Sequence, residues 1–109
     1  MDDLLELIFL IEKKGPGVFI GNDDIEYLAR FLSGYCFAKE EALNPSKQFD
    51  NWIRYGDWLW KDFSDFLAEK YQDRRSFNWP KLIAHNESDG NSTDAFFRLL
   101  HEYLETGKS

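Results

Sequence analysis

The sequence predicts an all-α domain of five to eight helices. β-Branched residues, which favour strands, are scarce: the chain has one Val, six Ile and two Thr. Apolar residues recur instead at intervals of three and four, the spacing that places them on one face of a helix. The length of 109 residues suits one domain, because domains commonly hold about 100 to 150 residues. We therefore expect a single helical domain over residues 1–105 and a frayed tail over 106–109.

The first predicted helix begins near residue 3 and ends at Lys13-Lys14. Gly15 suits a left-handed helix cap, and Pro16 cannot continue the helix. Pro16-Gly17 then suits the centre of a type II turn. Val18-Phe19-Ile20 is too short for an independent strand, so we interpret it as an extended connector.

The second predicted helix begins at Asp23-Asp24 and ends before Pro45, which makes it the longest. Carboxylates at its start suit the free N–H groups of the first turn. Cys36 lies on its apolar stripe and is interpreted as a small buried hydrophobe. As the only cysteine it cannot form a disulfide within the chain, which fits a reducing compartment.

The second half of the sequence predicts several shorter helices. Their boundaries follow from capping residues, prolines and polar loops. The elements are, in order, a helix capped by Ser46 across Phe49, Trp52 and Ile53, a break at Tyr55-Gly56-Asp57, a helix from Asp57 to Tyr71, a loop over 72–76, a short helix from Trp79-Pro80, a polar loop from Glu87 to Asn91, and a last helix from Thr93 to Glu105.

The acidic net charge of the chain limits the classes of partner that it is expected to bind. Thirteen Lys and Arg against twenty Asp and Glu give a net charge of −7, the wrong sign for holding a nucleic-acid backbone. The same charge favours fast capture of a basic protein, although acidic residues also serve solubility alone. The longest apolar run, Leu7 to Ile11, is far shorter than the roughly 20 residues that span a bilayer, and the acidic start lacks a signal peptide's basic region. We expect a cytoplasmic protein without a membrane partner.

The sequence contains no pattern typical of a catalytic or metal site. His85 and His101 lie outside the short spacings of zinc ligands, and Cys36 has no basic neighbour to activate it. The glycine-rich turn from Gly15 to Gly21 lacks the Lys-Ser/Thr of a phosphate-binding loop and is followed by acids. We therefore expect no enzymatic activity, no cofactor and no metal. A nucleotide-binding module or enzyme is the competing class.

Two tryptophans and the acids around them form the candidate binding surface. Residues two apart on a helix point about 200° away from each other, so Trp58 and Trp60 are not expected to face one core together. One of them either packs under the preceding loop or forms an exposed aromatic anchor for a partner. The candidate partner-binding residues are Tyr55, Asp57, Trp58, Trp60, Asp62 and Asp65, with Glu87 and Asp89 in the later polar loop.

Several short motifs occur in an order that resembles a known family. They are Lys14-Gly15-Pro16-Gly17-Val18-Phe19-Ile20-Gly21, Phe31-Leu32-Ser33-Gly34-Tyr35, Phe63 with Phe66-Leu67, Lys70-Tyr71, Trp79, Ile83 and Ala95-Phe96-Phe97-Arg98-Leu99-Leu100. In this order they resemble the immunity proteins of bacterial polymorphic-toxin and contact-dependent growth inhibition systems, which often carry an Arg-Pro-Gly-Met-Tyr-Leu-Gly-like turn and a Gly-Tyr in the next helix. Gly15 stands where that turn usually has Arg.

The resemblance implies a protein that binds and neutralises the toxic C-terminal domain of an effector made by the same cell or its siblings. Catalysis is not needed for this role. Such toxins are frequently nucleases, and a ribonuclease, including one of the ribonuclease A-like class, is the first expectation. Their active sites are basic because they hold phosphate, so an acidic inhibitor suits them. The alternative is an acidic helical adaptor or structural subunit without a toxin partner.

Overall fold

The computed structural model describes residues 3–19, 21, 24–43, 55–87 and 92–106. Within these residues every regular element is helical, which confirms the all-α prediction. The elements are α1 (Asp3–Lys14), α2 (Pro16–Phe19), α3 (Ile25–Leu43), the π-helical segment η1 (Trp58–Asp62), α4 (Phe63–Tyr71), α5 (Trp79–Asn86) and α6 (Ser92–Thr106). None of these helices is both long enough and apolar enough to cross a bilayer.

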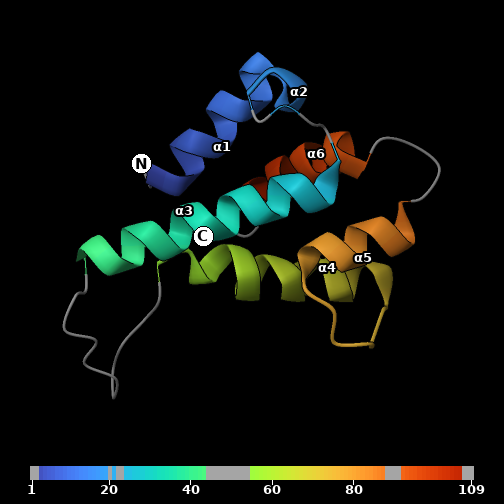
Figure 1. The fold of residues 1–109 in the computed structure, drawn as a ribbon. Helices are drawn as coiled ribbons and strands as arrows, with labels where there is room; N and C mark the ends of the chain where they lie inside the picture. Colours follow the sequence, from blue (N-terminus) through green and yellow to red (C-terminus); the bar gives the residue numbers. More distant parts are fainter. Residues whose placement is uncertain (1–2, 20, 22–23, 44–54, 88–91, 107–109) are drawn as a thin grey trace.

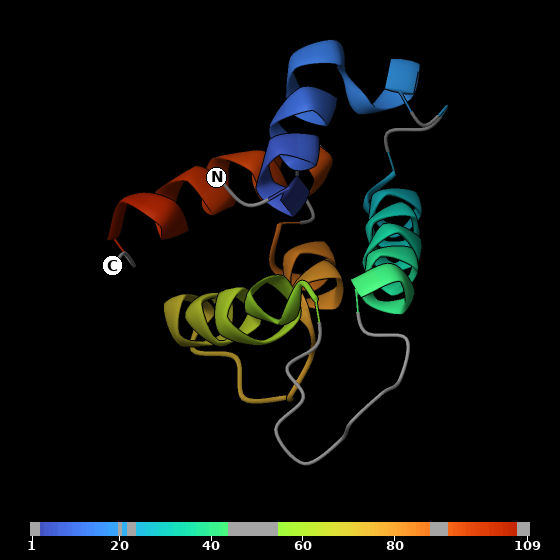
Figure 2. The same cartoon turned by 90° about the vertical axis from the view of Figure 1, so that its left-hand side faces the viewer.

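The helices form three layers (Figures 1 and 2). In Figure 1 α1 and α2 lie at the top, α3 and α6 in the middle, and α4 and α5 at the bottom, and Figure 2 shows α3 along the right-hand side. Apolar side chains from all three layers meet between them: Leu4 of α1, Leu32 of α3, Leu100 of α6 and Leu67 of α4 are each fully buried. The chain therefore has one hydrophobic core.

The first helix ends at Lys14, as the sequence predicts. Gly15 has φ of 91°, and its N–H donates to the Ile11 carbonyl oxygen at 2.8 Å. The predicted type II turn and extended connector are wrong, because the chain forms the short helix α2 over Pro16–Phe19. Proline suits the first turn of a helix, where its fixed φ is already correct and its missing N–H is not needed. Ile20 lies outside the described residues.

α3 is the longest helix in the described part of the chain and forms one outer side of the molecule (Figure 2). The Asp24 Oδ1 accepts a hydrogen bond from the Glu26 N–H at 2.8 Å, which confirms an acidic cap at the start of this helix. Its inward face buries Leu28, Leu32 and Cys36. The prediction that the cysteine is a small buried hydrophobe is confirmed.

A turn and a π-helical segment open the next helix. Gly56 has φ of 85°, so the predicted break before Asp57 is confirmed. η1 continues directly into α4, and the Phe63 N–H donates to the Trp58 carbonyl oxygen five residues earlier. The predicted helix from Asp57 to Tyr71 therefore has the correct extent. Its π-helical beginning was not predicted, because apolar spacing does not separate such a turn from a regular one.

An aromatic cluster joins α4, α5 and α6. Phe63, Trp79 and Phe96 are fully buried. The rings of Phe63 and Phe96 meet edge to face with centroids 5.9 Å apart, and Trp79 stacks on Phe96 at 4.6 Å, both favourable geometries. The Trp79 backbone N–H also donates to the Ser64 Oγ at 2.9 Å. The inner face of α4 is therefore held on a closely packed support.

Some predicted features lie outside the described residues. These are the helix capped by Ser46 across Phe49, Trp52 and Ile53, the loop residues 88–91, and residues 107–109 of the predicted tail. The loop over 72–76 and the helix from Trp79 are confirmed. The last helix is slightly longer than predicted and includes Thr106, whose hydroxyl donates to the Glu102 carbonyl oxygen at 3.0 Å.

Candidate functional site

An acidic stripe runs along the outer side of η1 and α4. It consists of Asp62, Asp65 and Glu69, which are all exposed. Their spacing of three and four residues puts them on one face of the helix, and seven residues of helix span about 10 Å. Asp62 and Asp65 belong to the candidate set from the sequence, whereas Glu69 does not. The stripe thus concentrates three negative charges on a supported surface.

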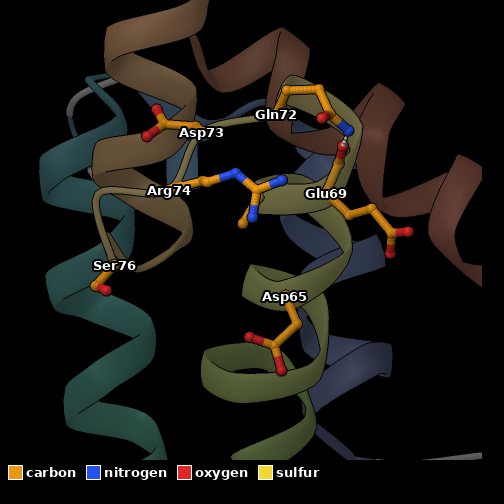
Figure 3. A pocket seen from close by; sticks show the side chains of 7 residues that line it. Asp65, Glu69, Gln72, Asp73, Arg74 and Ser76 are labelled. Atoms are coloured by element: carbon orange, nitrogen blue, oxygen red, sulfur yellow. Dashed lines mark hydrogen bonds between the residues drawn. The ribbon is translucent and has the colours of Figure 1, made fainter.

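The acidic stripe borders a surface hollow of about 520 Å³ between α4 and the loop that follows it (Figure 3). The residues that line it are Asp65, Ala68, Glu69, Gln72, Asp73, Arg74 and Ser76. In Figure 3 the Arg74 guanidinium reaches from the loop toward α4, while the Asp65 carboxylate projects from the helix itself. Among the described residues no group of three or more His, Cys, Asp or Glu side chains is arranged to hold a metal ion. The hollow is thus lined by charged side chains of both signs.

Helix capping fixes the shape of the loop beside this hollow. Gln72 has φ of 55°, and its N–H donates to the Glu69 carbonyl oxygen at 3.2 Å. The Asp73 N–H donates to the Ala68 carbonyl oxygen at 3.0 Å, which completes a Schellman cap. The Gln72 side-chain amide donates to the Glu69 carbonyl oxygen at 2.9 Å (dashed line in Figure 3), and so anchors a non-glycine residue in the left-handed conformation.

Asp73 is turned inward and anchors the loop. Its side chain is only 4% exposed. Arg75 donates to its two carboxylate oxygens through Nε at 2.9 Å and Nη2 at 2.6 Å, and the Asn86 Nδ2 donates at 3.1 Å. The hydrogen bonds from Arg75, and after them the one from Asn86, hold the pKa of Asp73 well below its usual range. The Asp73 carboxylate therefore stabilises the loop, and we do not include it in the candidate binding surface.

We expect Asp73→Asn to be less stable than the wild type at pH 7, with a difference that shrinks in acid. The pKa of Asp73 is lowered on folding from its ordinary value of 3.8, so its stabilising effect is complete above that pH and is lost as the pH falls through the folded-state pKa. Urea unfolding at neutral pH and at several acidic pH values measures this difference. Asp65→Asn, at an exposed carboxylate, is the matched control and should change little. If the stability lost in Asp73→Asn is the same at every pH, the Asp73 carboxylate does not stabilise the loop through its negative charge.

The three aromatic residues of the candidate surface are half-buried and pack against the core. Trp58 stacks on Tyr103 of α6 with ring centroids 6.3 Å apart, and Trp60 lies 5.3 Å from Trp79 of α5. Tyr55 meets Tyr35 of α3 edge to face at 6.2 Å. The prediction that the two tryptophans cannot both pack against the core is wrong. Trp58 contacts α6 and Trp60 contacts α5, so each ring has a neighbouring helix although the two rings point in different directions.

The remaining candidate residues divide between structural and exposed positions. Glu87 accepts a hydrogen bond from the Tyr71 hydroxyl at 2.7 Å and pairs with Arg98 at 3.2 Å, so both of its oxygens are engaged. Burial, and then the hydrogen bond to Glu87, raises the pKa of Tyr71 far above its usual range. Asp57 is half-buried at the start of η1. Asp89 lies outside the described residues.

The two histidines have contacts typical of surface packing. The His101 ring stacks on Phe9 with centroids 5.3 Å apart and interplanar angle 2°, and its Nε2 lies 2.9 Å from the Glu12 Oε1. His85 packs against Phe77 with centroids 5.2 Å apart. His101 thus joins α6 to α1, and neither histidine belongs to a group of three or more potential metal ligands in the described part of the chain.

The site contains two residues that the sequence reasoning missed. Glu69 continues the helical spacing of Asp62 and Asp65, so the spacing alone could have included it. Arg74 lies in the loop, and only the tertiary structure shows that it lines the same hollow. Comparisons with protein-family models, with curated protein sequences and with solved structures found no significant match. The site is therefore interpreted from its own geometry and charge.

Proposed function

We propose that this chain is an immunity protein that binds and neutralises the toxic C-terminal domain of a bacterial contact-dependent growth inhibition effector. The toxin domain would be a nuclease, with a ribonuclease of the ribonuclease A-like class as the first candidate, and binding would take place in the cytoplasm. The observation that carries the proposal is the acidic stripe, which presents three exposed carboxylates on a chain of net charge −7. The order of the sequence motifs supports the same family.

The chemistry of the stripe suits the active site of a nuclease. A cleft that holds a phosphate backbone is lined with Lys and Arg. Carboxylates that enter such a cleft form charge-assisted hydrogen bonds with the same cations. Because the stripe covers about 10 Å of helix, its three carboxylates can meet several cations at once. The chain would then inhibit by covering the cleft, without any catalytic step.

The close packing of α4 against the core, beneath the acidic stripe, favours binding through the stripe. Phe63 and Leu67 are fully buried on the opposite face of α4, and Ser64 accepts the hydrogen bond from Trp79. A helix fixed in this way presents its charged side chains on a backbone that need not be ordered on binding, which reduces the entropic cost of association. Since Trp58 and Trp60 are packed against the core, the proposed contact relies on charge more than on a tryptophan anchor.

We expect the double variant Asp62→Asn/Asp65→Asn to associate with the toxin domain about tenfold more slowly than the wild type at low salt. Exposed charges at an interface chiefly affect the association rate, so the dissociation rate should change less. High salt should reduce the difference, because it screens exposed charges. Stopped-flow binding to a catalytically inactive form of the proposed cognate toxin domain, at two salt concentrations, measures both rates.

The matched control removes the same charge from other faces of the molecule. Glu6→Gln/Glu26→Gln alters two exposed carboxylates, one on α1 and one on α3. If this control slows association as much as the stripe variant does, net charge rather than the acidic stripe guides the encounter. If neither variant differs from the wild type at low salt, the stripe is not the toxin-binding surface.

A further inference from the structure

An aromatic hollow adjoins the loop that connects α4 and α5. Its volume is about 340 Å³. The residues that line it come from α3, η1, the loop and α5, and are Glu26, Trp60, Ser76, Phe77, Asn78, Pro80 and Lys81. Ser76 also lines the hollow beside the acidic stripe (Figure 3). The two hollows are therefore neighbours, but of the two only this one is lined by aromatic side chains.

Three rings form the apolar part of the aromatic hollow. They are the half-buried rings of Trp60 and Phe77 and the buried ring of Pro80. Trp60 packs on Trp79 with ring centroids 5.3 Å apart, and Phe77 packs on His85 with centroids 5.2 Å apart. Because these contacts hold the rings in place, a ligand that binds between them orders little of the protein, which lowers the entropic cost of binding.

The polar groups of the aromatic hollow are mostly hydrogen-bond donors. Within the described part of the chain, four of its side chains form no hydrogen bond or ion pair, namely those of Trp60, Ser76, Asn78 and Lys81. Asn78 directly precedes α5, yet its side chain does not cap that helix. An indole N–H and an ammonium group can only donate, whereas a hydroxyl and an amide also accept. A ligand with several acceptors and few donors would therefore suit these groups.

The charges at the aromatic hollow favour a ligand whose acceptors are neutral. The exposed Glu26 carboxylate and the Lys81 ammonium line the hollow together, so their charges offset each other. The net charge of −7 adds a general repulsion of anions. Phosphates and carboxylates are thus disfavoured, and a cation on the ligand would find a partner in Glu26.

Proline-rich peptides combine these properties. A proline residue has a carbonyl acceptor but no backbone N–H. In the polyproline II conformation the carbonyl groups form no hydrogen bonds within the peptide, so they are free to accept from a protein. Such peptides dock in grooves lined by aromatic side chains, and their preformed conformation reduces the entropy lost on binding.

We propose that the aromatic hollow binds a proline-rich segment of a partner protein in the polyproline II conformation, with one basic residue at its end. Proline rings lie against Trp60 and Phe77. The Trp60 indole N–H and the Asn78 amide donate to carbonyl oxygens of the segment, and its basic residue pairs with Glu26. The inference goes beyond the proposed toxin binding and does not depend on it, because none of the carboxylates of the acidic stripe lines this hollow.

NMR titration of the isotope-labelled full chain with a synthetic peptide tests the proposal. The probe is an acetylated and amidated hexaproline peptide with an arginine at one end. Because the hollow contacts only a few residues, we expect a dissociation constant of about 0.1–1 mM. The indole N–H signal of Trp60 should shift on binding. That of Trp58, which does not line the hollow, should stay in place.

A flexible peptide tests the requirement for polyproline II conformation. A Gly-Ser peptide of the same length, with the same arginine, has to be ordered on binding and has no rings to fill the hollow. We expect it to bind at least about tenfold more weakly than the proline peptide.

Two exposed positions provide variants of the aromatic hollow. Asn78→Ala removes a donor but no helix cap, and should weaken binding about threefold to tenfold. Glu26→Gln should weaken binding of the arginine peptide about twofold to fivefold, and should not affect hexaproline without arginine. Glu6→Gln, at an exposed position on α1, removes the same charge elsewhere and should change neither affinity. Circular dichroism melting verifies that each variant is folded.

The outcomes that overturn the proposal are distinct from a failure of toxin binding. An unshifted Trp60 indole signal at saturating peptide, or equal affinity for the Gly-Ser peptide, shows that the aromatic hollow does not bind polyproline II segments. Unchanged affinity in Asn78→Ala overturns the assigned contacts. Tighter binding of a hexaproline peptide that ends in glutamate would make the hollow an anion site instead.

Discussion

Replacing Gly56 with alanine is expected to lower the free energy of unfolding by about 3 kcal/mol, a large part of the total stability of a small domain. Two costs combine. Gly56 has φ of 85°, a conformation that costs an L-residue about 1–2 kcal/mol. The added Cβ would also lie 2.6 Å from the Cys36 Sγ and 3.3 Å from the Leu4 Cδ2, and overpacking of a core costs about 1–3 kcal/mol.

Urea unfolding of matched glycine variants measures this effect. Gly34→Ala is the control, because a Cβ there meets nothing within 4 Å and alanine should stabilise the helix by up to about 1 kcal/mol. In a Cys36→Ala background, Gly56→Ala loses its contact with sulfur and should retain mainly the backbone cost. If Gly56→Ala is as stable as the wild type, the close approach of the 55–57 turn to α3 and α1 is not present in solution.

Phe63→Ala is expected to cost about 3–5 kcal/mol, because it leaves a cavity in the middle of the aromatic cluster. The Phe63 side chain is fully buried, and its ring lies 5.9 Å from that of Phe96 and 5.5 Å from that of Tyr103. These neighbours belong to α6, so their position relative to α4 depends on the missing ring. Guanidinium unfolding followed by tryptophan fluorescence measures the loss.

The control for Phe63→Ala is the same substitution at Phe37, which is 67% exposed. Surface substitutions commonly change stability by less than about 0.5 kcal/mol. A similar loss at both positions would mean that burial does not decide the stability of this chain, and that the aromatic cluster joining α4, α5 and α6 is described wrongly.

Helical periodicity and end signals were sufficient to predict most of the fold. Gly15 and the Asp24 cap mark helix ends through local chemistry, which a sequence displays directly. The π-helical η1 and the short helix at Pro16 were not predicted, since several conformations satisfy the same local pattern there. Boundaries with a specific capping or glycine signal were thus predictable, whereas the type of turn was not.

The candidate site was predictable only in its charged part. Asp62 and Asp65 are exposed, as their polarity and spacing indicate. The burial of Trp58 and Trp60 depends on where α5 and α6 cross η1, and the position of those helices arises from contacts distant in sequence. For the same reason Arg74 could not be assigned to the hollow from the sequence.

Survival of cells that make both this chain and the toxin domain is the most direct test of the proposed neutralisation. The proposed cognate toxin domain is induced in cells that express the wild type, the Asp62→Asn/Asp65→Asn variant or no inhibitor, with RNA and DNA integrity and viability as readouts. We predict intact nucleic acid and normal viability with the wild type, weaker protection with the variant, and killing without inhibitor. Killing of cells in which the wild-type chain accumulates as folded protein would contradict the proposed function.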